Sequence, residues 1–317
     1  MRLNMKKLFL NKKVHTLSHK ASAPGSIMLL GEHAVLHGYA AISAAINRKM
    51  TVSIFPNDST TLTIESSLGS FECDINDITI QKPFTFLLAC LKKKGLPSGC
   101  TIKVESEFSD KVGLGSSAAI TVATLKCLSQ WLNDDITKNQ LLRSAINIIH
   151  QVQGIGSGAD CAASVYGGVV YYNMIPCIVE PLKHIPDISL VYTGYKTPTT
   201  DVIAKVAKAY EAHPSLYNAL YEKMGECTEH AKVCINNQDW DGLGHTFFQQ
   251  QQLLDALGVS DKTINSIIDQ ALAEDAIKGA KISGSGLGDC IVTLGTLPSD
   301  AFKSRPNGIT RLSVSIA

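Results

Sequence analysis

Short stretches of alternating apolar and polar residues dominate the first hundred positions of the chain. Alternation of this kind places every second side chain against a core and is typical of half-buried β-strands. The pattern predicts strands over 51–55, 62–66, 71–75 and 101–107. Between the last two of these, residues 84–94 have the apolar spacing of a helix. The first part of the chain is therefore expected to form a sheet with helices packed on it.

Helical spacing is stronger in the rest of the chain. Residues 116–132 are the clearest case, because apolar side chains recur there every three or four positions. Further helices are predicted over 138–152, 200–213, 215–236, 239–257 and 261–275, and further strands over 169–172, 279–283, 290–295 and 309–316. Since strands and helices are mixed without a regular βαβ repeat, the pattern favours an α+β fold.

A proline-rich seam divides the chain into two predicted domains. Pro176, Pro181 and Pro186 interrupt the periodic pattern within a short distance of one another. We expect an N-terminal extension over residues 1–20, a first domain over 21–185 and a helix-rich second domain over 186–317. The length of 317 residues allows two domains of ordinary size, and 45% hydrophobic with 18% charged residues is a composition typical of globular chains.

Charge and cysteine content exclude several classes of function. A net charge of +1 offers no basic surface for nucleic acid. No apolar run reaches the length of a membrane span, so no membrane partner is expected. The nine cysteines are scattered, with neither a CxxC pair nor zinc-ligand spacing. They predict reduced thiols in a cytoplasmic protein.

Three glycine-rich segments carry the candidate chemistry, over residues 23–38, 111–119 and 281–289. In the middle segment, Gly113 and Gly115 allow a ligand to approach the backbone closely. The helix predicted from residue 116 then begins, and the free amides at a helix start bind phosphate oxygens. A glycine turn with a serine cap accounts for this segment equally well. The segment matches neither the P-loop nor the Rossmann pattern.

The three segments in this order resemble the GHMP kinases, a family named after galactokinase, homoserine kinase, mevalonate kinase and phosphomevalonate kinase. The similarity extends over the chain from about residue 20. It implies a first domain with a mixed sheet like domain 2 of ribosomal protein S5 and a helix-rich, ferredoxin-like second domain. It also implies ATP and Mg²⁺ as cofactors, phosphoryl transfer to a small alcohol, and a homodimer.

The resemblance assigns roles to individual residues. The ATP-binding positions it implies are Lys111, Gly113, Leu114, Gly115, Ser116, Ser117 and Ala118, with Ser117 also contacting the metal. The catalytic positions are Asp160 and Ser26. The substrate-binding positions are Glu32, His33, Gly158, Lys196, Thr200, Gly284, Ser285 and Gly286.

For three of these residues, a purely structural role is an alternative to the functional one. An aspartate at the start of a short helix, after a flexible glycine loop, suits a base that accepts a hydroxyl proton during phosphoryl transfer. The alternative for Asp160 is a helix-start acid favoured by the helix dipole. The alternatives for His33 and Lys111 are a buried core histidine and a solvated surface lysine.

Two positions depart from the pattern of the family. Ser26 stands where similar proteins carry a lysine, and a serine offers a hydrogen bond without a charge. Ile149 stands where the family has a metal-binding glutamate. Losing a charged partner in a dry site costs several kcal/mol of transition-state stabilisation. A catalytically weak sensor of nucleotides or metabolites is therefore an alternative to an active kinase.

The acceptor is the last open question. Residues 31–38 resemble mevalonate kinases, whereas residues 152–167 and 288–290 resemble phosphomevalonate kinases. An acceptor phosphate would need extra cations, and the matching loops contain no basic residues beyond Lys196 and Lys281. The prediction is therefore mevalonate, with phosphomevalonate as the alternative.

Overall fold

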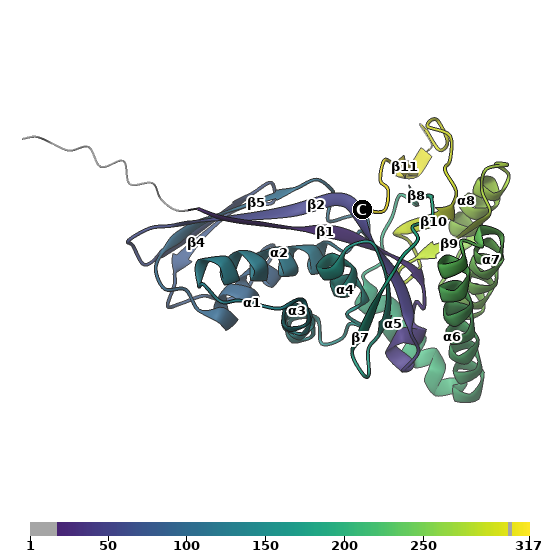
Figure 1. Cartoon of the computed structure of the whole chain (residues 1–317), viewed down its shortest axis with the longest axis horizontal. Helices are drawn as coiled ribbons and strands as arrows, with labels where there is room; N and C mark the ends of the chain where they lie inside the picture. Colours follow the sequence, from purple (N-terminus) through teal and green to yellow (C-terminus); the bar gives the residue numbers. More distant parts are fainter. Residues whose placement is uncertain (1–17, 304–305) are drawn as a thin grey trace, which may run out of the picture.

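The computed structural model describes residues 18–303 and 306–317. Most of the predicted extension over 1–20 therefore lies outside the described residues. The described chain forms a seven-stranded and a four-stranded sheet, each with its own set of helices, and Figure 1 shows the two sets side by side along the longest axis. The prediction of an α+β fold is confirmed.

The larger sheet contains the strands β1 (His19–Leu30), β2 (Ala41–Pro56), β3 (Thr61–Ser66), β4 (Gly69–Asp74), β5 (Cys100–Ser106), β6 (Val169–Asn173) and β7 (Ile178–Leu182). Their order is β4-β3-β5-β2-β6-β7, and β1 pairs with β2. Only β3 and β5 pair in parallel, so the sheet is mixed. The alternating pattern did not predict β1, because the stretch from Ile27 to Leu30 is buried on both faces and its residues no longer alternate.

Four helices cover one face of this sheet: α1 (Thr85–Lys94), α2 (Ser116–Trp131), α3 (Lys138–Gln153) and α4 (Ala159–Tyr166). α2 packs on β1 and β2 and contacts the other three helices. Its fully buried Val122 joins Leu88 of α1 and Ile148 of α3 in the core beneath the sheet. α3 begins with a capping box formed by Thr137 and Gln140, which matches the predicted start at residue 138.

The smaller sheet has the order β11-β8-β10-β9, with all pairs antiparallel. Its strands are β8 (Ile188–Tyr192), β9 (Gly279–Ser283), β10 (Cys290–Leu294) and β11 (Thr310–Leu312). Its helices are α5 (Thr199–Ala212), α6 (Pro214–Asn237), α7 (Trp240–Ala256) and α8 (Lys262–Leu272). None of the described helices combines the length and the apolar character needed to cross a lipid bilayer.

The predicted strand over 309–316 is too long, because only its first part pairs with β8. After Leu312 the chain crosses to the middle of β2, where Asn47 donates a backbone hydrogen bond of 2.9 Å to Ser315. Val314 and Ile316 are packed against the core between the two sheets. Their burial in that core produces the alternation that the sequence shows.

A shared hydrophobic core joins the two halves of the molecule. It contains Ile27 and Leu29 of β1 together with Leu190 of β8, Phe247 of α7 and Val292 of β10. The predicted domain boundary at residues 185–186 lies between β7, which belongs to the larger sheet, and β8, which belongs to the smaller one. Because β1 is in contact with both halves, residues near its C-terminal end face the second half directly.

Candidate functional site

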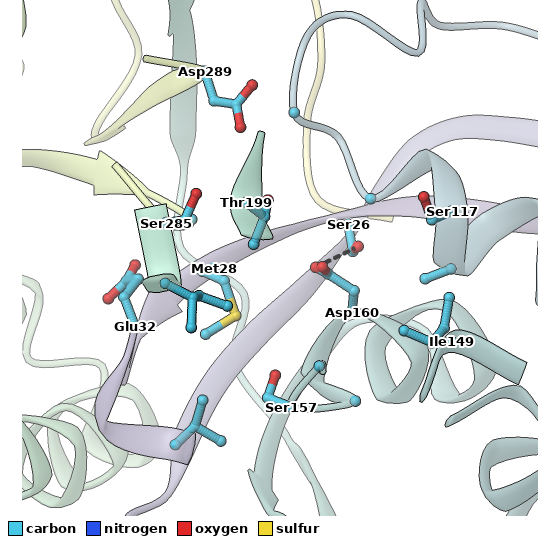
Figure 2. Close-up of a pocket in the computed structure, with 18 of the residues that line it drawn as sticks. Ser26, Met28, Glu32, Ser117, Ile149, Ser157, Asp160, Thr199, Ser285 and Asp289 are labelled. Carbon is cyan, nitrogen blue, oxygen red and sulfur yellow. Dashed lines mark hydrogen bonds between the residues drawn. The ribbon is translucent and has the colours of Figure 1, made fainter. Parts of the chain in front are cut away.

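The three glycine-rich segments meet around a cavity of about 210 Å³ between the two halves. Figure 2 shows residues from all three segments, such as Ser26, Ser117 and Ser285, around this cavity. Ser157, in the loop between α3 and α4, and Asp160, at the start of α4, close another side. We refer to this space as the inner cavity.

A wider outer cavity of about 790 Å³ adjoins the inner one. Its apolar wall is formed by Met50, Leu68, Phe84, Phe86 and Phe108, among others. Six residues line both cavities and mark their junction: Ser116, Ser117, Gln153, Lys196, Thr199 and Thr200. The starts of α2 and α5 therefore lie where the two spaces meet.

The start of α2 has the properties of an anion-binding site. Gly115 caps the helix with a φ of 64°, and no side chain bonds to the first amides. A Cβ on Gly115 would lie 2.0 Å from Ser26 Oγ, so only glycine allows the loop to pack on β1. Ser116, Ser117 and Ala118 line the inner cavity. The free amides and the positive end of the helix dipole thus face a space open to a ligand.

Two of the predicted ATP contacts are not at either cavity. Leu114 is buried in the core between the halves, and its carbonyl accepts a 3.1 Å hydrogen bond from the Ser26 amide. Lys111 is exposed and is absent from the walls of both cavities. This position fits the alternative of a solvated lysine, and the contact of Lys111 with ATP stays a prediction.

Asp160 is the second residue of α4 and lies beside Ser26. The Ser26 hydroxyl donates a 2.8 Å hydrogen bond to Asp160 Oδ1, drawn as a dashed line in Figure 2. Ser43 holds the helix start in place by donating a 2.9 Å hydrogen bond to the Ala159 carbonyl. Burial raises the pKa of Asp160, while the Ser26 hydrogen bond and the charge of Lys196 lower it. A carboxylate with a raised pKa is a stronger proton acceptor than an ordinary aspartate.

Glu32 is fixed by the second half of the molecule. Lys281 donates to Glu32 Oε1, and Gln250 donates a 3.2 Å hydrogen bond to Glu32 Oε2. Glu32 and Lys281 are fully buried at the level of their side chains. Burial lowers the pKa of Lys281, and the charge of Glu32 opposes that shift. Glu32 thus joins the two halves, and its contact with a substrate stays a prediction.

His33 also bonds across the two halves. Its Nε2–H donates a 2.8 Å hydrogen bond to the Ser285 carbonyl. Burial lowers the pKa of His33, so its neutral form is favoured near pH 7 and Nδ1 is left as an acceptor. Because the ring also lines the inner cavity, it can accept a hydrogen bond from a bound hydroxyl. His33 therefore links the two halves through its hydrogen bond to Ser285 and also forms part of the wall of the inner cavity.

The remaining predicted substrate contacts divide by position. Gly158, Lys196, Thr200, Gly284 and Ser285 line the inner cavity. The Ser285 hydroxyl is buried and has no hydrogen-bond partner within the described chain. Gly286 is not at the cavity, because its backbone packs against Val259. Its contact with a substrate stays a prediction.

The structure adds Asp289, which the sequence did not single out as a site residue. It is only 5% exposed, lines the inner cavity, and lies 3.4 Å from Lys196 Nζ through Oδ1. A Cβ on Gly113 would lie 2.5 Å from Asp289 Cγ, so the carboxylate rests against the glycine turn before α2. The position of Asp289 at the end of the third glycine-rich segment was the available signal, but its contact with Gly113 joins residues far apart in the sequence.

Ile149 forms an apolar wall near Asp160, as Figure 2 shows. Among residues 18–303 and 306–317, no group of three or more His, Cys, Asp or Glu side chains is arranged to hold a metal ion. A cation at this site would therefore depend on oxygen atoms of a ligand in addition to Ser117 and single carboxylates.

Comparison with known proteins matches segments from both halves of the chain to one family. A family model described as the GHMP kinases N terminal domain matches residues 81–168, and one described as GHMP kinases C terminal matches residues 231–303. A galactokinase galactose-binding signature matches residues 8–56. The mevalonate kinase of Pyrococcus furiosus is 32% identical over 298 residues, which cover 86% of this chain and 88% of that protein.

Solved structures share the fold over nearly the whole chain. The Lin0012 protein of Listeria innocua has a TM-score of 0.81 at 22% identity and covers 95% of this chain and 99% of its own. The L. major mevalonate kinase, solved with R-mevalonate, has a TM-score of 0.77 at 23% identity and covers 94% and 95%. At these identities the likeness concerns the fold alone.

Proposed function

Because the chain belongs to the GHMP kinase family, we propose that it transfers the γ-phosphoryl group of ATP to the primary hydroxyl of mevalonate, with Mg²⁺ bound to the phosphates. One observation carries this proposal. The uncapped start of α2 lies at the junction of two cavities, and Asp160 lines the inner one. A phosphate group at that junction has a nucleotide-sized space on one side and a candidate base on the other.

The two cavities suit the two substrates. The outer cavity has the volume and the apolar wall of a nucleoside site. The triphosphate would extend toward the free amides of residues 116–118, and the hydroxyls of Ser116 and Ser117 would contact the phosphates. Ser117 would also contact Mg²⁺, which in proteins typically binds to few side chains and to substrate phosphates. The metal would neutralise charge on the phosphate oxygens when bound.

Asp160 performs the proton transfer in this proposal. It accepts the proton of the mevalonate hydroxyl as that oxygen forms a bond to the γ-phosphorus. The bond between the γ-phosphorus and the oxygen bridging to the β-phosphate breaks, and ADP leaves with that electron pair. Ser26 orients the carboxylate through its 2.8 Å hydrogen bond. The rest of catalysis is the alignment of the two substrates by the cavity walls.

The charges around the inner cavity favour an unphosphorylated acceptor. Lys196 is the only lysine or arginine on its described wall, and Lys281 is committed to Glu32. A phosphorylated acceptor would normally need several cationic donors. Met28, Val35 and Ile149 offer apolar contacts for a branched carbon skeleton. These features support mevalonate over its 5-phosphate.

A side-by-side steady-state assay tests the acceptor. With ATP and Mg²⁺ in excess, we expect kcat/KM for mevalonate to exceed that for 5-phosphomevalonate by at least about tenfold, because the cavity lacks cations for a second phosphate. The measurement is ADP release followed by a coupled assay. Turnover of 5-phosphomevalonate alone would identify a phosphomevalonate kinase. Nucleotide binding without turnover of either acceptor would favour the sensor.

The proposal also covers the oligomeric state of the protein and its cellular compartment. The family resemblance predicts a homodimer, and the cysteine pattern predicts a cytoplasmic protein. All nine thiols are free, which is compatible with a reducing compartment. Both statements stay predictions.

A further inference from the structure

We propose that Lys196 is the cation that contacts the transferring phosphoryl group, and that Asp289 is the residue that positions it. This inference rests on the proposed phosphoryl transfer and adds a catalytic residue to it. Lys196 is the only lysine or arginine on the described walls of the inner and outer cavities. The site otherwise contributes carboxylates, hydroxyls, amides and apolar groups to the surroundings of a highly charged triphosphate.

The location of Lys196 identifies which phosphate it contacts. A phosphoryl group that passes from a nucleotide in the outer cavity to an acceptor in the inner one must cross their junction. Of the six residues that line both cavities, Lys196 is the only charged one. Ser116 and Ser117 at the start of α2 belong to the same junction. Their hydroxyls and the lysine ammonium would therefore surround the terminal phosphate.

Hydrogen bonds fix the backbone on both sides of Lys196. The Thr193 amide donates to the Asp289 carbonyl at 2.9 Å, and the Asp289 amide donates to the Tyr195 carbonyl at 2.9 Å. On the other side, the Thr197 hydroxyl donates to the Leu287 carbonyl at 2.6 Å. The segment that carries the lysine is thus attached to the third glycine-rich segment. A lysine that only contributed to solubility would not need such support.

The ion pair between Lys196 and Asp289 leaves N–H donors of the lysine available to a ligand. Lys196 Nζ lies 3.4 Å from Asp289 Oδ1, and the lysine side chain is 33% exposed while that of the aspartate is 8% exposed. The ammonium group has three N–H donors, and Asp289 is its only ion-pair partner in the part of the chain that the structure describes. Asp289 itself is held against Gly113. The aspartate therefore anchors the ammonium next to the phosphate-binding turn and leaves it free to bind a ligand.

The same cation acts on the base. Asp160 accepts the Ser26 hydrogen bond and is subject to the charge of Lys196, and its own charge acts on the Cys161 thiol and the Asp289 carboxyl group. The charge of Asp160 raises the pKa of Asp289, and Lys196 lowers the pKa of both carboxyl groups. Since Asp160 must be ionised to accept a proton, Lys196 supports the base as well as the phosphoryl group. Ser26 cannot supply this charge.

Nucleotide affinity tests the contact with the terminal phosphate. Lys196→Met removes the charge at similar length, Lys196→Arg keeps the charge, and Lys208→Met changes an exposed lysine of α5 as a control. Calorimetry measures the Kd of a non-hydrolysable ATP analogue and of ADP for each protein. We expect Lys196→Met to weaken the analogue by about tenfold and ADP by less than about threefold. Lys196→Arg should recover most of the loss, and Lys208→Met should match the unmodified protein.

Equal weakening of both nucleotides by Lys196→Met would contradict the contact. The contact would also be contradicted if Lys196→Met raised the KM for the acceptor and left the ratio of the Kd values for the ATP analogue and ADP unchanged. The lysine would then bind the acceptor. These affinities are measured without an acceptor. The outcome of this affinity test therefore does not depend on whether mevalonate is the substrate.

The pH dependence of kcat tests the positioning role of Asp289. Lys196→Met should move the acidic limb of the profile to higher pH, because the cation that lowers the pKa of Asp160 is gone. Asp289→Asn should move that limb in the same direction, because Lys196 loses the anchor that holds its charge near Asp160, and should lower kcat for the same reason. A merely structural role would move neither limb. A higher Mg²⁺ requirement for Asp289→Asn with an unmoved limb would overturn the assignment and make Asp289 a metal ligand.

Discussion

Replacing Asp160 with asparagine is expected to lower kcat by a factor of about 10² to 10⁴, which is the range for loss of a general base. Asparagine has the same shape and still accepts the Ser26 hydrogen bond, so the cavity wall is preserved. It cannot accept the proton of the substrate hydroxyl. Steady-state rates with saturating mevalonate and ATP, together with the Kd of ADP, measure the effect. The Kd of ADP should change by less than about threefold, because Asp160 does not line the outer cavity.

Thermal stability separates the base from a helix-start acid. Burial raises the pKa of Asp160, so the fold disfavours its ionised form, and asparagine removes that cost. The Tm of Asp160→Asn should therefore equal or exceed that of the unmodified protein. Asp269→Asn, an exposed change on α8, is the control for losing one carboxylate. A lower Tm with retained turnover would show that Asp160 serves the helix and not the reaction.

Lys281→Met is expected to lower the free energy of unfolding by about 3–5 kcal/mol, the usual cost of removing one partner of a buried ion pair. The change leaves the Glu32 carboxylate buried between the two halves with only the Gln250 hydrogen bond. Urea denaturation measures the loss. Lys278→Met is the matched control, because Lys278 and Asp241 form an exposed pair whose loss should cost less than about 1 kcal/mol.

A second substitution checks the cause of that loss. Adding Glu32→Gln to Lys281→Met removes the stranded charge, so the double variant should be more stable than Lys281→Met alone. If the double variant lost as much as the two single variants together, the two side chains would act independently. The buried pair would then not be the link between the halves.

Periodic segments could be predicted from the sequence because local spacing determines them. The predicted helices over 116–132 and 138–152 end within one residue of α2 and α3. Segments buried on both faces have no alternation to detect, which is why β8 and the second half of β1 were missed. β7 contains Pro181 and pairs only with β6, so it has the composition expected of an edge strand. Neither kind of strand has a strong local signal.

The features of the candidate site also differ in whether they could be predicted from the sequence, depending on whether they are local or long-range. The glycine-rich segments indicated the turns that form the cavity, because positive φ and close approach leave a mark on local sequence. The contact of Glu32 with Lys281 joins residues 249 positions apart, and that of Asp289 with Gly113 is also long-range. Such pairs arise from the packing of two domains, and one sequence does not reveal them. Lys111 shows the converse, since its place beside the turn did not bring it to the cavity.

A crystal structure with mevalonate and a non-hydrolysable ATP analogue tests the central claim most directly. The account predicts the triphosphate against the amides of residues 116–118, its terminal group at the junction of the two cavities, and the primary hydroxyl of mevalonate within hydrogen-bond distance of Asp160. A nucleotide bound elsewhere, with the start of α2 free and Asp160 far from the acceptor hydroxyl, would contradict it.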